Sequence, residues 1–319
     1  KTLSLQTELS NPIFLGGLLV FILGLGLVAG SYPAFYLSSF KPIQALKGKV
    51  SNGFRGKGIR NTLVVFQFPI SVALIITTFF VQKQLNYTSN YNLGFENENI
   101  LQVHNLELID NSSIVTLQNI LQQNPAFTQV GYSDLVAPNI FNEDKYKAEG
   151  PENNPVTLNR VIVDEDYIDL LSPKFIVGRN FDDNRASDKY AIILNVSGAK
   201  TLGFGAPETY DTDSPIGKYV TFPGSETVKF EVIGVGEDFN YNSLRMTISP
   251  LMIAHKGNGE LYNIGTSYLS ARVDPAQVNS GEKMSKLLDE VKTELASIKP
   301  GLPFEYSFMD QDFESSFRT

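Results

Sequence analysis

The feature that most constrains this chain is a stretch without acidic residues, from Leu9 to Phe95, that contains two long apolar runs. Residues 13–30 and residues 62–81 carry no charged side chain. A helix needs about 20 apolar residues to cross a hydrocarbon core of roughly 30 Å. The two runs therefore predict two membrane-spanning helices.

A basic loop separates the two runs. Its charged side chains are all cationic: Lys41, Lys47, Lys49, Arg55, Lys57 and Arg60. Short loops rich in Lys and Arg stay on the cytoplasmic side of a membrane. We therefore expect the linker at residues 41–60, with Lys41, Pro42 and Arg60, to be cytoplasmic. The amino terminus and everything after about residue 82 should then lie outside.

The net charge of −8 divides unevenly along the chain. Residues 1–95 carry eight basic and one acidic residue, a balance of +7, and residues 96–319 carry eighteen basic and thirty-three acidic residues, a balance of −15. Nucleic-acid binding calls for a basic surface, so the acidic outer region excludes that class. Cysteine is absent, which excludes a disulfide framework and thiol chemistry and fits a bacterial envelope protein.

Hydrophobic periodicity in the outer region predicts two β-α-β units. Residues 100–103 and 127–132 read as strands around a helix at 114–122, and residues 267–273 and 304–308 read as strands around a helix at 282–298. Shorter strands are predicted between the units, at 156–163, 175–177, 191–194, 219–222, 229–235 and 251–254. We interpret about 175–262 as a lobe inserted into one α+β domain.

Few residues suggest chemistry. His104 and His255 each stand in a predicted strand context, directly after a predicted strand, without a nearby Cys or second His, so both are interpreted as structural. An acidic group at Asp164, Glu165, Asp166 and Asp169 could hold a divalent cation, but it precedes a predicted helix, where acidic residues favour capping. No phosphate-binding loop is visible. The sequence predicts no catalytic residue, no cofactor and no metal.

Within the apolar runs, four residues indicate helix packing. Gly26 and Gly30 have GxxxG spacing, which permits close helix approach, although glycine is frequent in that run. Gln67 and Pro69 indicate a face turned toward protein, because an amide in hydrocarbon needs a partner and proline frees a backbone carbonyl.

The last residues favour a helix that Asp310 caps, with acidic residues in its first turn and Phe313 and Phe317 on one face. No stop signal follows. We expect the chain to be a piece of a longer protein in which this helix leads into a third span.

Several short motifs, taken in their order along the chain, resemble those of a known family. Residues 30–34 and 41–48 resemble the cytoplasmic end of the last helix of an FtsX-like permease domain, and residues 60–68 resemble the helix that leads into a MacB-like periplasmic core domain. That core domain has characteristic short motifs, and similar motifs occur in this chain at residues 92–95, 177–181, 232–235, 238–239, 243–244 and 308–313.

The resemblance implies a tandem ABC-transporter permease of the MacB/FtsX type in the bacterial inner membrane, multi-pass, with its large domain in the periplasm. The implied layout is the end of a first permease domain at 1–40, the linker at 41–60, a helix and stalk at 61–91 with Leu85 in the stalk, and the core domain at 92–319. That domain would combine a porter-like β-α-β lobe with the inserted lobe.

The same resemblance implies a mechanism and partners. ATP hydrolysis on a cytoplasmic ABC ATPase would move the membrane helices, and stalks would transmit that motion to the periplasmic domain for export or envelope substrate handling. Other partners would be the remaining permease helices of the same tandem protein, membrane lipid, and periplasmic or outer-membrane proteins.

Two other classes stay open at the level of sequence. A membrane-anchored extracytoplasmic sensor or receptor would need a cytoplasmic output domain after the next span, whereas a permease would continue with closely spaced hydrophobic helices. A tethered envelope enzyme is disfavoured because no nucleophile, base or metal cluster converges in the sequence.

Overall fold

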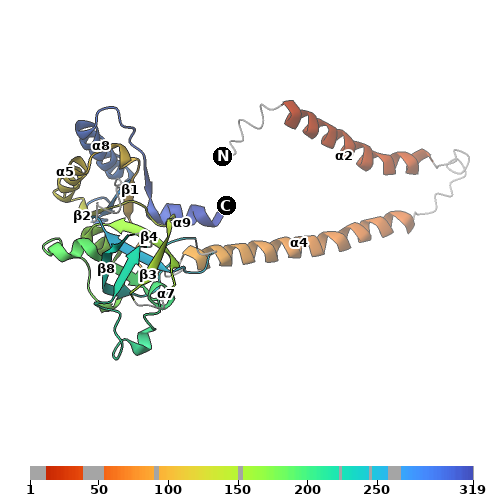
Figure 1. Ribbon diagram of the computed structural model, residues 1–319. Coiled ribbons are helices and arrows are strands. Elements are labelled where there is room, and N and C mark those ends of the chain that lie inside the picture. The colour runs from red at the N-terminus through yellow and green to blue at the C-terminus, as the bar shows by residue number, and fades with distance from the viewer. Residues whose placement is uncertain are drawn as a thin grey trace, which may run out of the picture. The chain divides into compact units, whose positions relative to one another are not determined.

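A computed structural model describes residues 12–38, 54–89, 93–149, 154–222, 225–243, 246–257 and 267–318. It divides into two compact units, Lys1–Leu85 and Asn86–Thr319. Each unit is considered by itself below, and Figure 1 gives the element labels.

The first unit is helical. Its helices are α2 (Pro12–Ser38) and α4 (Phe54–Ser89), and α4 continues into the second unit. Among the described residues, one helical segment is long and apolar enough to cross a bilayer, Val64–Gln84 in α4, and α2 holds a shorter apolar segment, Leu15–Ser31. The membrane span predicted at residues 13–30 therefore stays a prediction. Because α4 begins at Phe54, the end of the predicted linker is helical.

Side chains of these helices suit an apolar solvent. Leu27 is 75% exposed and Phe66 is 68% exposed, which water would disfavour and lipid or neighbouring helices would not. The hydroxyls of Thr77 and Thr78 each donate to the carbonyl four residues back, at 2.8 Å, so neither needs water.

The second unit opens with a split β-α-β sheet. Strand β1 (Ile100–Val103) pairs antiparallel with both β10 (Tyr268–Val273) and β11 (Tyr306–Phe308), and β10 also pairs antiparallel with β2 (Phe127–Ser133). The order β11-β1-β10-β2 interleaves the two predicted β-α-β units, because each unit's strands flank a strand of the other. The predicted strands are confirmed, although the last begins at Tyr306.

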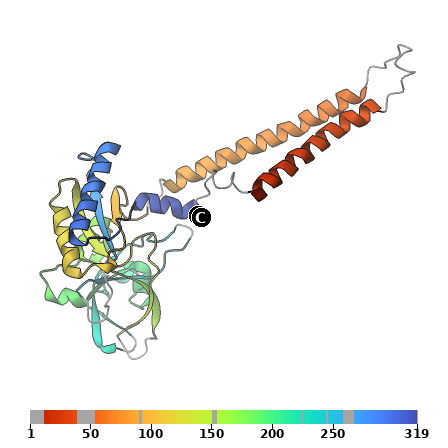
Figure 2. The same cartoon turned by 90° about the horizontal axis from the view of Figure 1, so that it is seen from above.

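Two helices cover one face of this sheet, α5 (Asn111–Gln122) and α8 (Gly281–Ile298), which contact each other (Figures 1 and 2). Asp110 caps α5 by accepting from the Ser113 amide at 3.0 Å, and Ser280 caps α8. Each helix buries one stripe, as its periodicity predicts: Ile114, Leu117 and Leu121 in α5, and Leu287, Val291 and Leu295 in α8.

Six strands between β2 and β10 close into a ring. The pairing runs from β4 through β3, β7, β8, β6 and β9 and returns to β4 by a parallel β4–β9 ladder. Their bounds are β3 (Glu143–Ala148), β4 (Val156–Val163), β6 (Ala191–Asn195), β7 (Tyr219–Phe222), β8 (Ser225–Gly236) and β9 (Leu251–His255), and β5 (Phe175–Gly178) pairs with β8.

The ring shows where the sequence interpretation was incomplete. Strand β3 was not predicted, because four of its six residues are charged and only Tyr146 and Ala148 are buried. Both β3 and β4 precede residue 175, so the predicted inserted lobe, 175–262, covers only the later strands of the ring.

Short helices complete the second unit. They are α6 (Glu165–Leu171), α7 (Val196–Thr201), α9 (Met309–Arg318) and the 3-10 helices η1 (Leu106–Leu108), η2 (Ala186–Tyr190) and η3 (Pro207–Thr209). The sequence predicted Asp310 as the cap of the last helix. Because α9 begins at Met309, Asp310 lies in the first turn instead.

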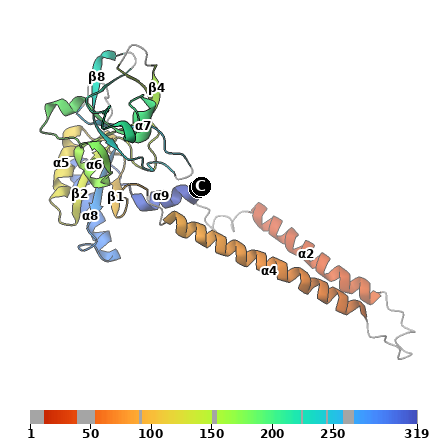
Figure 3. The same ribbon diagram turned by 90° about the horizontal axis from the view of Figure 1, so that it is seen from below.

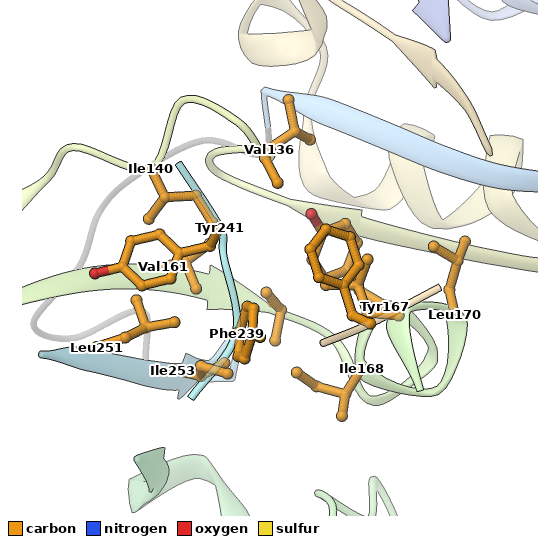
Figure 4. Packing of buried hydrophobic residues seen from close by; sticks show 14 of the residues in the cluster. Val136, Ile140, Val161, Tyr167, Ile168, Leu170, Phe239, Tyr241, Leu251 and Ile253 are labelled. Atoms are coloured by element: carbon orange, nitrogen blue, oxygen red, sulfur yellow. The ribbon is translucent and has the colours of Figure 1, made fainter. Parts of the chain in front are cut away.

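Strands β6 and β9 of the ring and most of β4 are buried on both sides, whereas β3 and β7 carry exposed residues. Alternate residues, such as Leu158 and Ile162 of β4, contribute to the ring's own core with α7, whereas Val161 and Val163 face a second core. Figure 4 shows this second core, in which Phe239 and Tyr241 lie among β4 and β9 side chains, with Tyr167 and Ile168 of α6 nearby.

Candidate functional site

The first and last described segments of the β-rich domain, residues 93–98 and α9, share one apolar cluster. Leu93 and Phe95 come from the incoming segment, which we define as residues 93–98, and Met309 and Phe313 come from α9. All four are buried with Phe239 in the same core. We call these five residues the stalk junction.

Aromatic contacts organise the stalk junction. The ring centroid of Phe95 lies 5.7 Å from that of Phe239 and 5.8 Å from that of Phe313. Such edge and tilted pairs contribute beyond simple burial. Phe95 of the incoming segment therefore packs against both Phe239 and Phe313 of α9.

A glycine allows the incoming segment to make these contacts. Gly94 has φ of +89°, and a Cβ there would lie 2.9 Å from the Phe239 Cβ. Both the backbone conformation and this close contact therefore exclude a side chain. The turn at Gly94 lets both Leu93 and Phe95 point into the core. The Asn240 amide then donates to the Leu93 carbonyl at 2.8 Å.

Arg272 of β10 binds the incoming segment from the other side. Its guanidinium donates to the carbonyls of Glu98 at 3.1 Å, Glu96 at 3.2 Å and Leu170 at 2.5 Å. The Glu96 amide also donates to the Leu171 carbonyl at 3.1 Å. Because Leu170 and Leu171 end α6, these bonds join the incoming segment to the carboxyl end of that helix.

The start of α6 is anchored to β2 by a buried carboxylate. Asp164 Oδ1 accepts from the backbone amides of Tyr167 at 2.7 Å and Tyr132 at 3.1 Å, and Oδ2 accepts from Gln118 Nε2 at 2.8 Å. Burial raises the pKa of Asp164 to about 7, against the opposing charge of Lys256 and the two amide donors. The capping role that the sequence predicts is confirmed for Asp164.

Close packing requires glycine in β2 below this helix. A Cβ on Gly131 would lie 2.3 Å from the Tyr167 nitrogen, which is backbone and cannot swing away. The α6 backbone thus packs directly against β2, and Figure 3 shows the helix beside that strand.

Four charged or titratable side chains meet at the amino end of α6. His255 Nε2, at the end of β9, lies 3.2 Å from Asp183 Oδ1 and 3.6 Å from Glu165 Oε2, and Lys256 Nζ lies 3.4 Å from Asp183 Oδ2 and 3.5 Å from Glu165 Oε2. We call these four residues the ion group.

Within the ion group, the electrostatics favour the charged forms of Glu165 and Lys256. Burial raises the pKa of Glu165, but nearby His255 and Lys256 outweigh burial and bring that pKa down to about 2. Burial lowers the pKa of Lys256, yet the acidic surroundings raise it above its usual range. The Lys256 ammonium also lies 4.8 Å from the Tyr132 ring centroid.

The ion group has the residue types of a metal site, because a histidine nitrogen and two carboxylates converge within 4.8 Å. Two observations oppose that use. Lys256 already supplies the cation that the two carboxylates need. The Gly257 amide donates to His255 Nδ1 at 3.1 Å, so the imidazole proton belongs on Nε2, the atom that would bind the metal. We interpret the group as an ion network.

His104 has a structural partner as well. Its Nε2 lies 2.8 Å from Ser307 Oγ, which in turn donates to Asp312 Oδ2 at 2.5 Å. This series of hydrogen bonds connects the end of β1 to β11 and α9. A catalytic triad would need the carboxylate on the histidine rather than on the serine, so this arrangement does not activate Ser307.

A buried arginine strengthens the ring where β3 and β4 meet β2. Arg160 is 2% exposed and pairs with Asp134 at 3.2 Å and Asp144 at 3.1 Å. A hollow of about 450 Å³ lies beside this pair, lined by Glu143, Asp144, Lys145, Thr157 and Phe222. The paired charges hold three strands together, since removing one partner would leave another charge buried and unpaired.

The residues predicted from the sequence as packing sites lie in the first unit. Gly26 and Gly30 are in α2 with open space around them, and Gln67 and Pro69 are exposed in α4. Leu85 and Arg60 also belong to α4, whereas Lys41 and Pro42 lie outside the described residues. Their roles stay predictions.

Sequence reasoning missed the stalk junction, the role of Arg272 and the convergence at His255. Phe95, Phe239 and Phe313 stand in motifs that the sequence singled out, but nothing in their spacing showed that they touch. The partners of Arg272 are backbone carbonyls, which no side-chain pattern reveals. His255 meets Glu165 and Asp183 only through the ring closure.

Comparisons with known proteins identify a family. The family model of the MacB-like periplasmic core domain matches residues 69–292. No curated protein matches the chain.

Matches among solved structures include three transporter or permease domains. The periplasmic region of MacB from Actinobacillus actinomycetemcomitans is 15% identical, with a TM-score of 0.48, covering 72% of this chain and 98% of that one. The extracellular domain of the noncanonic ABC-type transporter YknZ from Gram-positive bacteria is 18% identical (TM-score 0.43; 66% and 100% covered). A domain of a putative permease from Porphyromonas gingivalis is 16% identical (TM-score 0.44; 67% and 92% covered).

Proposed function

This chain belongs to the family of MacB-like periplasmic core domains, and on that premise we propose that it is part of the permease subunit of an ABC transporter. In this proposal a cytoplasmic ATPase supplies the energy, the membrane helices move, and the outer domain receives that motion for export or for handling of envelope substrates. The outer domain lies in the periplasm, and the protein crosses the inner membrane more than once.

The stalk junction is the observation that carries this proposal. A helix moved in the membrane acts on a domain only if the connection between them is stiff. Here the segment that follows α4 is packed through Phe95 against Phe239 and Phe313 and is bonded through its backbone to Arg272 and α6. A flexible tether would lack such contacts.

The proposal assigns the parts of the chain as follows. Residues 1–40 end a first permease domain, residues 41–60 form a cytoplasmic linker, residues 61–91 form a membrane helix and its stalk, and residues 92–319 form the core domain. The continuous helix Phe54–Ser89 supports the stalk, because it extends beyond the apolar segment Val64–Gln84.

Co-purification of the full-length parent protein, with a stalk variant and a matched control, tests the proposal. Leu85→Pro removes a helical hydrogen bond in α4 and kinks the stalk. Leu85→Ala changes the same side chain but keeps the helix. We expect an ATPase subunit to co-purify in all cases and the Pro variant alone to hydrolyse ATP without supporting the envelope phenotype.

Two results would overturn the proposal. Recovery of the intact membrane protein without an ATPase would favour a receptor. An unchanged phenotype in a membrane-inserted Leu85→Pro protein would show that the stalk carries no motion.

A further inference from the structure

We propose that the outer domain contacts the lipid surface of the membrane through two paired loops, residues 135–142 and 239–249, which we call the loop pair. The partner is the headgroup layer of the bilayer that α4 crosses. This inference rests on the proposed function, since it needs α4 to span that bilayer. It goes beyond the proposed function by giving the outer domain a lipid contact of its own.

The two loops hold each other in place. Asn139 and Asn242 form an isolated antiparallel bridge. The Asn242 side chain accepts from the Ile140 amide at 2.9 Å and donates to the Ile140 carbonyl at 3.0 Å. Ile140 and Tyr241 are buried in the same core (Figure 4). The loop pair is therefore a fixed part of the domain, and so are the backbone positions from which its exposed side chains project.

Each loop exposes one large apolar side chain. Phe141 is 53% exposed and Met246 is 49% exposed. Among the described large apolar residues of the outer domain, only Leu108, at 66%, is more exposed. Aromatic and apolar side chains of this kind are favourable at the boundary between lipid headgroups and acyl chains. The loop pair thus offers two side chains that a lipid surface would cover.

Charge distinguishes the loop pair from the rest of the outer domain. Residues 135–142 and 239–249 contain no Asp or Glu, and their one charged residue is Arg245. Residues 96–319 as a whole carry thirty-three acidic residues. Anionic lipid surfaces attract Lys and Arg and repel carboxylates. The loop pair therefore complements such a surface, whereas Leu108, which stands between Glu107 and Asp110, does not.

The loop pair is bonded to the segment that arrives from the membrane helix. The Asn240 amide donates to the Leu93 carbonyl at 2.8 Å. Leu93 is the ninth residue after Gln84, where the apolar segment ends, and α4 stays helical to Ser89. At about 1.5 Å per helical residue and about 3.5 Å per extended residue, Leu93 lies within roughly 20 Å of the end of that segment. This short connection keeps the loop pair near the lipid surface.

A weak lipid contact is enough because the domain is already tethered. Two apolar side chains alone would bind a free domain to a bilayer only marginally, since even a whole acyl chain gives reversible binding. A short tether raises the effective concentration of the lipid surface and makes the second contact intramolecular. The tether then sets the distance between domain and membrane, and the loop pair determines which side of the domain meets the lipid.

Quenching of a fluorophore by nitroxide-labelled lipid tests the contact. The full-length parent, with any cysteine outside this chain replaced by Ser, is reconstituted in vesicles of phosphatidylcholine and phosphatidylglycerol without ATP. This chain has no cysteine, so each introduced one is a single labelled site. Phe141→Cys and Met246→Cys report the loop pair. Leu108→Cys is the matched exposed control, and Ile75→Cys, in the apolar segment of α4, reports membrane insertion.

We expect lipid nitroxides to remove half or more of the fluorescence at Ile75 and at both loop positions, and to leave Leu108 nearly unquenched. Met246→Asp places a carboxylate on the loop pair, so it should reduce quenching of the label at Phe141 to the level of Leu108. Leu108→Asp is its control and should leave the label at Phe141 as strongly quenched as in the parent.

The outcomes separate the lipid contact from the proposed function. Quenching at Ile75 together with loop labels no more quenched than Leu108 overturns the contact and leaves the permease proposal standing. Loop labels that are shielded from aqueous iodide but not quenched by lipid also overturn it, because a protein then covers the loop pair.

Two further results would count against the contact. Quenching at Phe141 that persists in Met246→Asp would show proximity imposed by the tether alone. Absence of quenching at Ile75 would mean that α4 is not in the bilayer, and both proposals would fail. Should a labelled loop variant not fold, Thr247→Cys, at an exposed position of the same loop, decides by the same criteria.

Discussion

The two ends of α6 are held by opposite kinds of chemistry. At the carboxyl end, the incoming segment is fixed by the aromatic stalk junction and by backbone bonds to Arg272. At the amino end, the ring is held by the ion group. The stability that apolar packing contributes depends on how well side chains fill the space and does not change with pH, whereas the stability that the ion group contributes depends on its protonation state. The two connections can therefore be broken separately.

The largest effect should come from truncating the stalk junction. Phe313→Ala removes a buried aromatic ring and should cost about 3–5 kcal/mol of outer-domain stability. Phe230→Ala, equally buried but in the ring core, should cost a similar amount. Unfolding of the full-length protein measures both losses, and hydrogen exchange of α9 should rise sharply only for Phe313→Ala. Equal α9 protection in the two variants would contradict the junction.

The second-largest loss of stability should come from displacing α6 as a whole. Gly131→Ala places a methyl group against the α6 backbone, where it cannot be accommodated, and overpacking of this kind costs roughly 1–3 kcal/mol or more. Gly281→Ala is the control, because open space surrounds that position at the start of α8. Thermal unfolding should show a clear decrease for the first variant and none for the second. An unchanged Gly131→Ala protein would mean that α6 does not pack this closely.

Arg272→Gln should have an intermediate effect. It removes charged donors from three backbone carbonyls, and such bonds contribute about 1.5–3 kcal/mol. Arg185→Gln, which removes an exposed pair with Asp182, should cost less than about 0.5 kcal/mol. Denaturant unfolding compares them, and hydrogen exchange of residues 93–98 should increase only for Arg272→Gln. The same exchange in both variants would rule out the role of Arg272 in holding residues 93–98.

The smallest effect, and the only pH-dependent one, should come from Glu165→Gln. Because the folded-state pKa of Glu165 is lowered to about 2, its ionised form stabilises the fold above the unfolded pKa of about 4.3, and this contribution is lost as pH falls through about 2. After solvent screening we expect about 1–2 kcal/mol at pH 7. Unfolding at several pH values should show the difference between parent and variant shrinking below about pH 4. A stability difference between parent and variant that does not depend on pH would contradict a charged Glu165 in the ion group.

The sequence predicted the split sheet well because its signals are local. The stripe of Leu287, Val291 and Leu295 in α8 has helical spacing, and residues 100–103 form a strand with the predicted bounds. Asp164 stands where a capping residue is expected. Each of these signals depends on neighbours within about one helical turn or one strand.

The ring and the stalk junction could not be predicted from the same reasoning, because their contacts join distant segments. Strand β3 is recognisable only from its partners β4 and β7. Phe95 and Phe313 are separated by most of the outer domain in sequence, and they meet only because α9 returns beside β1. His255 joins Glu165 through a parallel ladder that closes the ring.

Hydrogen exchange of the full-length parent with its ATPase, in the presence and absence of ATP, tests the central claim most directly. If ATP-driven motion enters through the stalk junction, residues 93–98, α6 and α9 should change their exchange together, while the stripes of α5 and α8 that pack on the split sheet stay constant. Unchanged exchange in all three segments during ATP hydrolysis would contradict the account.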